Sequence, residues 1–206
     1  RYNPPHVCTD AMMSTGSCSN IPEPDADPLD AGGHGTHVAG IVCGRQFGVA
    51  PDVRLHVGSV IESETILTSA ARVLRGLNWL IQTFDREDMR GSPRIINLSL
   101  GFDRDLVRQE LRRDIDARFK KHIEGMRLIL NQASVTGEAM IFAAIGNGGA
   151  GRAGYPALFE SVFGIGAVDF DGKVAGFSGS FGVRPGQGGL EGLPAGGEPD
   201  FFGYGQ

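Results

Sequence analysis

The sequence contains few cysteines and no long hydrophobic run. With three cysteines among 206 residues, at least one thiol has no cysteine partner within the chain. Cys8 and Cys18 could bridge a short loop, whereas Cys43 lies in an apolar segment and is predicted to be a small buried hydrophobe. No apolar run approaches the roughly 20 residues that a bilayer crossing needs, so no membrane span is predicted.

The sequence also lacks a strong excess of basic charge. The net charge is −5, and neither a basic stripe nor an aromatic stacking pattern occurs, so nucleic acid is not predicted as a partner. Glycine is abundant instead, with 32 residues, many of which suit tight turns and close backbone approach. A chain of 206 residues is predicted to form a single domain, residues 1–206, with a substantial core.

Short apolar runs alternate with a helical pattern along the chain. Residues 53–60 and 95–100 are predicted strands buried on both faces, and the amphipathic segment 66–82 between them is a predicted helix. Residues 140–144 form another predicted buried strand. Strand, helix and strand in this order predict an α/β fold with a parallel sheet and right-handed crossovers.

Three regions depart from this alternation. Residues 1–31 are rich in Pro, Asp, Ser and Gly and are predicted to be an irregular surface segment. Residues 103–135 are predicted to be an enlarged helical region, whose apolar side chains recur every three or four positions and whose basic side chains form a solvated face or, alternatively, a docking surface. The glycine- and proline-rich residues 182–198 are predicted to be a long loop.

One histidine stands between glycines at the head of a small, apolar segment. Residues 32–40 read Gly-Gly-His-Gly-Thr-His-Val-Ala-Gly, and the helix predicted to follow His34 should cross the core and stop at Gly44. An imidazole in this position can take a proton from a nucleophile and return it to a leaving group. Taken alone, His34 could equally be a structural residue or a metal ligand.

Further segments extend this motif in chain order. They are residues 48–55, 95–101, 142–149, 155–168, 177–178 and 199–205. Together with residues 32–40, they resemble the motifs of the subtilisin-like serine proteases. The resemblance implies a three-layer sandwich with a mainly parallel, twisted sheet flanked by helices, and peptide-bond hydrolysis through an acyl-enzyme.

The resemblance also implies roles for particular residues. His34 matches the catalytic base, and Asn147 matches the residue whose amide stabilises the oxyanion. Two segments match the strands that bracket the substrate pocket and pair with an extended peptide, namely Ser99, Leu100 and Gly101, and Ala143, Ala144 and Ile145.

The family's other two catalytic motifs have no clear match. Asp10 is the candidate for the aspartate, although no apolar strand run precedes it, and the Gly-Thr-Ser-Met-Ala motif of the nucleophile is absent. Ser69 is predicted to lie in a helix, and Ser178 at a strand end. Cys43 is a poor alternative nucleophile, because nine helical residues would separate it from His34 by roughly 13 Å. The expected fold therefore lacks the serine-bearing helix.

The resemblance also implies expectations for the cofactors, the partners and the compartment of the protein. The short connection at residues 44–48 resembles the proteinase K branch and leaves no room for calcium, whereas residues 23–30 could hold a weak calcium site, and no other metal or cofactor is predicted. The predicted partner is a polypeptide substrate, with a complementing segment or second chain covering the site of the serine helix. The compartment cannot be read from the residues, and the resemblance alone slightly favours a secreted or extracytoplasmic location.

Two functions follow from these observations. The first is a serine-type endopeptidase whose serine lies outside these residues. The alternative is a catalytically inactive pseudoprotease of the same fold that binds peptides or proteins. Retention of His34 and Asn147 in their motifs favours the first, because a binding scaffold would require neither.

Overall fold

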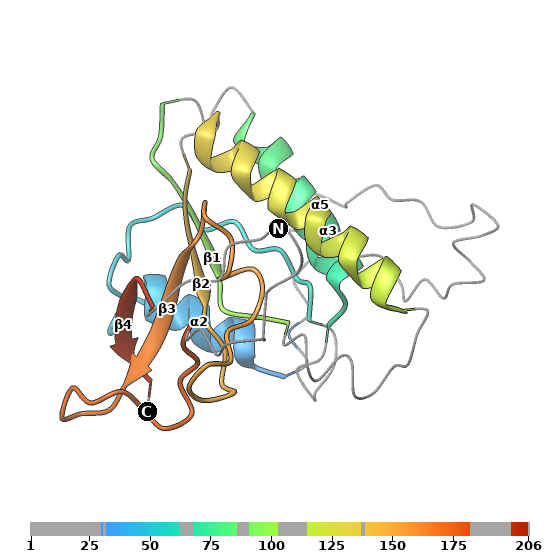
Figure 1. Ribbon diagram of the computed structural model, residues 1–206. Coiled ribbons are helices and arrows are strands. Elements are labelled where there is room, and N and C mark those ends of the chain that lie inside the picture. The colour runs from blue at the N-terminus through green and yellow to red at the C-terminus, as the bar shows by residue number, and fades with distance from the viewer. Residues whose placement is uncertain are drawn as a thin grey trace. The chain divides into compact units, whose positions relative to one another are not determined.

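The computed structural model describes residues 30, 32–61, 68–85, 91–102, 115–136, 139–181 and 199–205. The backbone divides into two compact units, Arg1–Glu87 and Asp88–Gln206. The first unit contains helices α2 (His34–Cys43) and α3 (Ala70–Phe84). The second contains strands β1 (Arg94–Leu98), β2 (Ala139–Ala144), β3 (Phe163–Val168) and β4 (Phe201–Tyr204), and helix α5 (Ile115–Val135) (Figure 1).

Helix α2 begins and ends at glycines, as the sequence predicts. Gly33 has a left-handed backbone with φ of 69°, and at the other end the Gly44 N–H donates to the Gly40 carbonyl over 2.9 Å. The burial predicted for this helix is wrong, since no residue of α2 is buried and Ile41 is 54% exposed. An apolar sequence shows that burial would be favourable, but only a covering surface can provide it.

The segment after α2 differs from its prediction. Backbone N–H groups of Val49 and Ala50 donate to the carbonyls of Ile41 and Val42, over 3.1 and 2.9 Å, and thereby fold the chain back along the helix end. The strand predicted at residues 53–60 is not formed in the described residues, and Val53 and Leu55 are exposed. A short apolar run becomes a strand only where a neighbouring strand completes its hydrogen bonds.

Helix α3 confirms the amphipathic helix predicted at residues 66–82, with a later start. Ser69 precedes the helix, and its side chain accepts a hydrogen bond from the Arg72 N–H over 3.2 Å. A serine at this position satisfies one of the N–H groups that a helix start leaves without a partner. The buried side includes Val73, Leu77 and Phe84, which recur at helical spacing.

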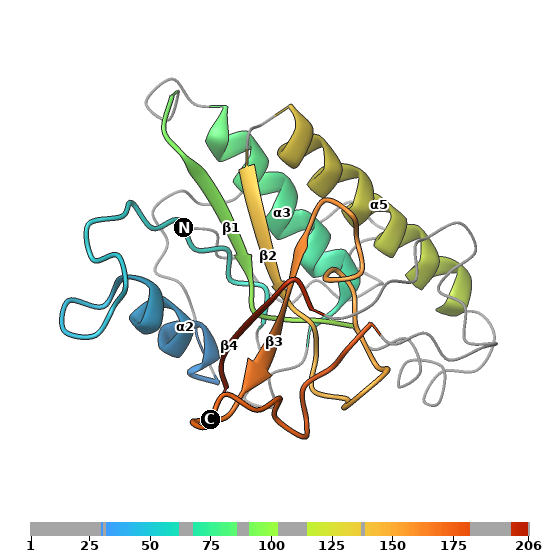
Figure 2. The ribbon, with the colours of Figure 1, turned by 60° about the vertical axis from the view of Figure 1, so that its left-hand side comes forward.

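The second unit is organised by a parallel sheet in the order β1-β2-β3-β4 (Figure 2). Strands β1 and β2 confirm two strands predicted from apolar runs, and β3 lies in the segment 155–168 that matches a family motif, whereas β4 was not predicted as a strand from its residues. The register pairs Ile95 with Met140, Phe142 with Phe163, and Ile165 with Phe201, so these six side chains lie on the same face of the sheet.

The two faces of the sheet are buried unequally. On one face Ile96 and Ile141 are 2% and 0% exposed, whereas on the other Ile95 and Met140 are 64% and 52% exposed. The prediction that β1 and β2 are buried on both faces is therefore wrong for one face. Uninterrupted apolar sequence is typical of strands covered on both sides, but it does not supply the second layer.

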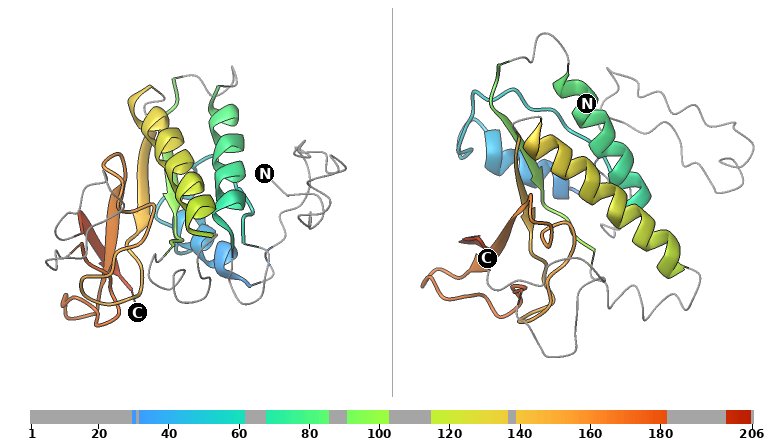
Figure 3. Two further views of the ribbon diagram at one scale, coloured as in Figure 1. Left: turned by 45° about the vertical axis from the view of Figure 1, so that its right-hand side comes forward. Right: turned by 45° about the horizontal axis from the view of Figure 1, so that its top comes forward.

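Helix α5 packs against β2 (Figure 3). Ile123 and Met126, two of the apolar positions predicted to recur in this region, are fully buried, as is Leu130. Lys120 and Lys121 are exposed, as both a solvated face and a docking surface require. Residues 103–114 of the predicted helical region and the loop at 182–198 lie outside the described residues. Among the described helices, none combines the length and apolarity needed to cross a membrane.

Candidate active site

Asn147 lies in a turn that follows β2. The strand ends at Ala144, and the Ile145 N–H still donates to the Ile165 carbonyl of β3 over 2.9 Å. The chain then turns at Gly146, whose φ of 109° is a backbone conformation that favours glycine. Asn147 follows directly and is exposed to solvent. The turn therefore presents an amide side chain at the carboxyl end of a buried strand.

A pocket of about 490 Å³ lies beside this asparagine. It is at the carboxyl ends of β2 and β3, where open α/β sheets place their sites. Its lining residues come from both strands, the turn between them and two later segments, namely Ala144, Ile145, Gly146, Asn147, Ile165, Gly166, Ala167, Phe177 and Gly205. Two of the predicted substrate-binding residues and the predicted oxyanion residue thus line the same pocket.

The six predicted substrate-binding residues offer mainly backbone. Ala143 and Ile145 are each 1% exposed, so their side chains belong to the core. A Cβ added at Gly101 would lie 3.5 Å from the Tyr155 carbonyl oxygen and 3.8 Å from that of Ala144, which places the end of the first segment beside the second. The Ser99 hydroxyl accepts a hydrogen bond from the Asn97 amide over 3.0 Å, and Leu100 is half-buried.

His34 is the first residue of α2, and it is half-buried. A carboxylate lies nearby, because Oδ2 of Asp30 accepts a hydrogen bond from the Thr36 N–H over 2.7 Å. This bond satisfies an N–H group at the helix start. Hydrogen bonds from Thr36 chiefly lower the pKa of Asp30, with a smaller contribution from the charge of His34. Asp30 was not singled out for this role from the sequence. The signal that could have found it is an aspartate shortly before a predicted helix, because carboxylates there can accept hydrogen bonds from the first N–H groups of the helix.

His34 belongs to the first unit, and Asn147 to the second. That the two face one cleft stays a prediction. Asp10 lies outside the described residues, as do all residues of the candidate calcium segment 23–30 except Asp30. Among the described side chains, no group of three or more His, Cys, Asp or Glu residues gathers as metal ligands would.

The serines considered as substitute nucleophiles have structural hydrogen bonds. Ser69 caps α3. Ser178 is 3% exposed, accepts from the Ala167 N–H over 3.0 Å and donates to the Gly179 carbonyl over 3.2 Å. The Ser180 hydroxyl accepts from the Gly151 N–H over 2.8 Å. The strand predicted to end at Ser178 is not formed, and this segment is a turn followed by extended chain.

Cys43 occupies the last position of α2, at the opposite end from His34. Its thiol donates to the Ala39 carbonyl of the preceding turn over 3.3 Å. The side chain is half-buried, so the prediction of a buried residue is wrong. The cause is the exposure of α2 as a whole, since none of its residues is buried.

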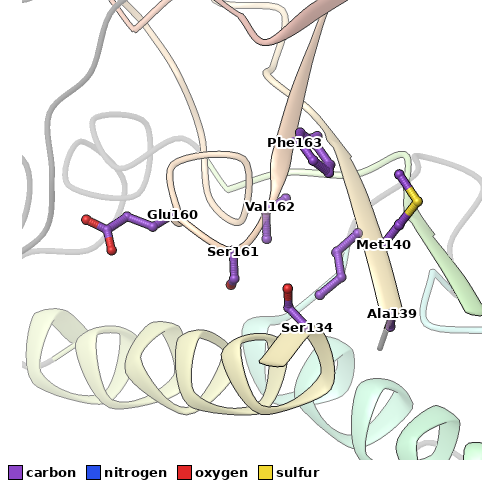
Figure 4. Close-up of a pocket in the computed structure, with 8 residues that line it drawn as sticks. Ser134, Ala139, Met140, Glu160, Ser161, Val162 and Phe163 are labelled. Carbon is purple, nitrogen blue, oxygen red and sulfur yellow. The ribbon is translucent and has the colours of Figure 1, made fainter. Parts of the chain in front are cut away.

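A second pocket lies at the opposite, amino ends of β2 and β3 (Figure 4). It has a volume of about 350 Å³, and Ser134 of α5 and Ser161 both border it. In the close-up, Glu160 points away from the other labelled side chains. None of the described candidate residues lines this pocket. The pocket at Asn147 is therefore the better candidate site, because it contains the predicted chemistry.

Comparison with known proteins agrees with the geometry. The model of the subtilase family matches residues 6–184, and the chain belongs to this family. It is 41% identical over 159 residues to the subtilisin-like protease PopC of Myxococcus xanthus (strain DK1622), covering 77% of this chain and 32% of PopC. Subtilisin DY of Bacillus licheniformis is 31% identical over 157 residues, with 72% of this chain and 48% of that protein covered.

A solved structure supports the fold. The crystal structure of a lanthipeptide protease superposes with a TM-score of 0.55 at 19% identity, covering 75% of this chain and 43% of that one. The parallel sheet with helices is thus the subtilisin-like α/β fold that the sequence predicted. The chain spans a third to a half of the relatives it matches.

Proposed function

We propose that this chain is part of a serine-type endopeptidase that hydrolyses peptide bonds through an acyl-enzyme. The observation that carries the proposal is the exposed Asn147 turn beside a pocket at the carboxyl ends of β2 and β3. An asparagine amide there can donate a hydrogen bond to the oxygen that becomes negative as the carbonyl is attacked. Membership of the subtilase family supports the same reaction class.

His34 is the proposed general base. It would take the proton of the attacking serine and pass it to the leaving amine, and an aspartate would orient the imidazole and stabilise its charged form. Asp10 is the candidate for that aspartate. We assign the nucleophile to a serine outside these 206 residues, because the hydroxyls of Ser178 and Ser180 already hold backbone groups within the fold.

The proposed substrate is an extended polypeptide. We expect such a peptide to pair through its main chain with residues 99–101 and to lie beside residues 143–145. The Ile145 N–H and carbonyl are already bonded, to the Ile165 carbonyl and the Gly154 N–H. The proposed chemistry uses no metal or organic cofactor, since base, oxyanion donor and nucleophile are all side chains. Residues 23–30 remain a candidate for structural calcium.

Replacement of His34 tests the proposal. In the product of the complete coding sequence, His34→Ala should lower kcat for an internally quenched peptide by about 10⁴-fold or more, because the base acts mainly in the transition state. KM should change little. His122→Ala, a histidine substitution in α5, serves as the matched control and should leave both constants within about threefold of their original values.

The same measurements separate the two functions. Peptide binding without hydrolysis by the unsubstituted protein would support the inactive pseudoprotease. A loss of only about tenfold in His34→Ala would show that His34 is not the base. The 206-residue chain itself should not react with a fluorophosphonate probe, which modifies an activated serine. Labelling in proportion to the amount of chain would contradict the assignment of the nucleophile.

A further inference from the structure

The turn that carries Asn147 has little regular structure of its own. Gly146, Gly149 and Gly151 have φ values of 109°, 81° and 78°, so its backbone alternates into conformations that neither helix nor strand adopts. Glycines lose more conformational freedom on ordering than other residues. An oxyanion donor must nevertheless be held in place before the reaction. The turn therefore needs support from elsewhere in the chain.

That support comes from residues 177–180, here named the bracing segment. The Gly149 N–H donates to the Phe177 carbonyl over 2.9 Å, and the Gly179 N–H donates to the Gly146 carbonyl over 2.8 Å. These two bonds lie on either side of Asn147 in the sequence. A third joins the Gly151 N–H to the Ser180 hydroxyl over 2.8 Å, across a separation of 29 residues.

Close packing accompanies these hydrogen bonds. A Cβ added at Gly179 would lie 2.6 Å from the Arg152 carbonyl oxygen and 3.0 and 3.1 Å from those of Ile145 and Gly146. The backbone of the bracing segment thus touches the turn both before and after Asn147. Gly176, immediately before the segment, has open space around the position of an added Cβ. The requirement for glycine is therefore specific to Gly179.

The bracing segment is itself fixed to the sheet. The buried Ser178 hydroxyl accepts from the Ala167 N–H of β3 over 3.0 Å, and the Ala175 N–H donates to the Ala167 carbonyl over 2.9 Å. The same hydroxyl donates to the Gly179 carbonyl over 3.2 Å, so its donor and acceptor positions are both used within the fold and fix the segment against β3. The chain of contacts runs from β3 through Ser178 and Gly179 to the Asn147 turn.

We propose that Ser178, Gly179 and Ser180 are positioning residues that hold the Asn147 amide where the oxyanion forms. This role rests on the proposed function for its effect on catalysis. Ser178 and Ser180 are thereby given a part in the reaction through the backbone, without touching the substrate. The segment joins the oxyanion turn to the sheet, so its loss should affect kcat more than KM.

Kinetics of paired variants test the catalytic part of the inference. In the product of the complete coding sequence, Ser180→Ala and Gly179→Ala should each lower kcat by about 10- to 100-fold, with KM within about threefold, because small displacements of a catalytic group are costly. Ser180→Thr keeps the hydroxyl and should recover most of the activity. Gly176→Ala is the matched control and should retain kcat, since its methyl group meets nothing.

A double-mutant cycle separates positioning from general stability. In an Asn147→Ala background the donor is gone, so Ser180→Ala should cost less than about threefold in kcat. The same loss in both backgrounds would overturn the proposal, because a merely structural residue would not depend on Asn147. If Gly179→Ala fails to fold, the cycle with Ser180→Ala still decides.

Hydrogen exchange tests the brace without any activity. In the 206-residue chain, the Gly151 amide should exchange at least about tenfold faster in Ser180→Ala than in the unsubstituted chain or in Gly176→Ala. Unchanged exchange in Ser180→Ala would overturn the brace. If Ser180→Ala loses this protection while the product of the complete coding sequence hydrolyses no peptide, the brace is supported and only the proposed endopeptidase is rejected.

Discussion

At the scale of single residues, the site depends on where glycines and short polar side chains stand. Gly146 lets the chain turn sharply after β2, so that Asn147 leaves the strand and reaches solvent beside the pocket. The hydroxyls of Ser178 and Ser180 accept hydrogen bonds from the backbone N–H groups of Ala167 and Gly151. Near His34, the Asp30 carboxylate holds the backbone in a similar way, because it accepts a hydrogen bond from the Thr36 N–H in the first turn of α2.

The carboxylate of Asp30 should make stability depend on pH. Hydrogen bonds from Thr36 lower its pKa in the folded chain below the ordinary value of about 3.9. Its contribution is therefore present above that value and is lost as the pH falls through the lowered pKa. Thermal melts from about pH 6 down to about pH 3 should show a smaller acid-induced drop in Tm for Asp30→Asn, which cannot titrate.

The control for this pH dependence is Asp52→Asn, an exposed carboxylate in the same unit. It should keep the pH profile of the unsubstituted chain. Asp30→Ala removes the acceptor altogether and should lower Tm near neutral pH, because the Thr36 N–H at the helix start loses its side-chain partner. An Asp30→Asn profile that follows the original at every pH would contradict the assigned role of this carboxylate.

At the scale of elements, α5 shows which part of a helix determines stability. Leu128 and Leu130 stand close together in the sequence, yet Leu128 is 56% exposed and Leu130 is fully buried. Helical geometry causes this difference, because side chains two positions apart point in well-separated directions around the axis. Leu130 shares its buried side with Ile123 and Met126 where α5 packs against β2.

The two leucines form a matched pair of truncations. Leu130→Ala should lower the free energy of unfolding by about 2–5 kcal/mol, because it removes buried methyl groups and leaves a cavity. Leu128→Ala should change it by less than about 0.5 kcal/mol, as surface substitutions usually do. Urea unfolding of both variants makes the comparison. Equal losses would show that α5 does not pack through the side that contains Leu130.

At the scale of the whole molecule, an apolar face of the sheet is exposed in this chain. Ile95, Met140, Phe163 and Phe201 share that face and are between 37% and 64% exposed. Phe163 lies between Phe142 and Phe201, with ring centroids 5.2 and 5.7 Å away. Contiguous apolar surface of this kind is unusual on a protein that stays monomeric.

We expect this sheet face to make the 206-residue chain bind apolar dyes and self-associate. Replacing Ile95 and Met140 together by threonine should reduce both ANS fluorescence and the sedimentation coefficient at high concentration, while keeping side chains that suit a strand. Val174→Thr, at an exposed valine outside the strands, is the control and should leave both unchanged. Equal dye binding by the paired variant and the original chain would show that this face is covered in solution.

The sequence by itself determined several of the elements and the family to which the chain belongs. The apolar runs gave β1 and β2, the helical spacing gave α3 and α5, and glycines marked both ends of α2, because propensity and periodicity act over a few neighbouring residues. The segment that contains β3 was found through the family resemblance. The motifs around His34 and Asn147 likewise identified a family through local patterns.

Only the tertiary structure decided what covers each element and what holds each turn. It left one face of the sheet exposed, left residues 53–60 without a strand, and added β4, which was not predicted from its residues. It also brought residues 177–180 against the Asn147 turn. Burial and long-range hydrogen bonds require a second segment that is distant in the sequence, and a local pattern of residues cannot predict which segment that is.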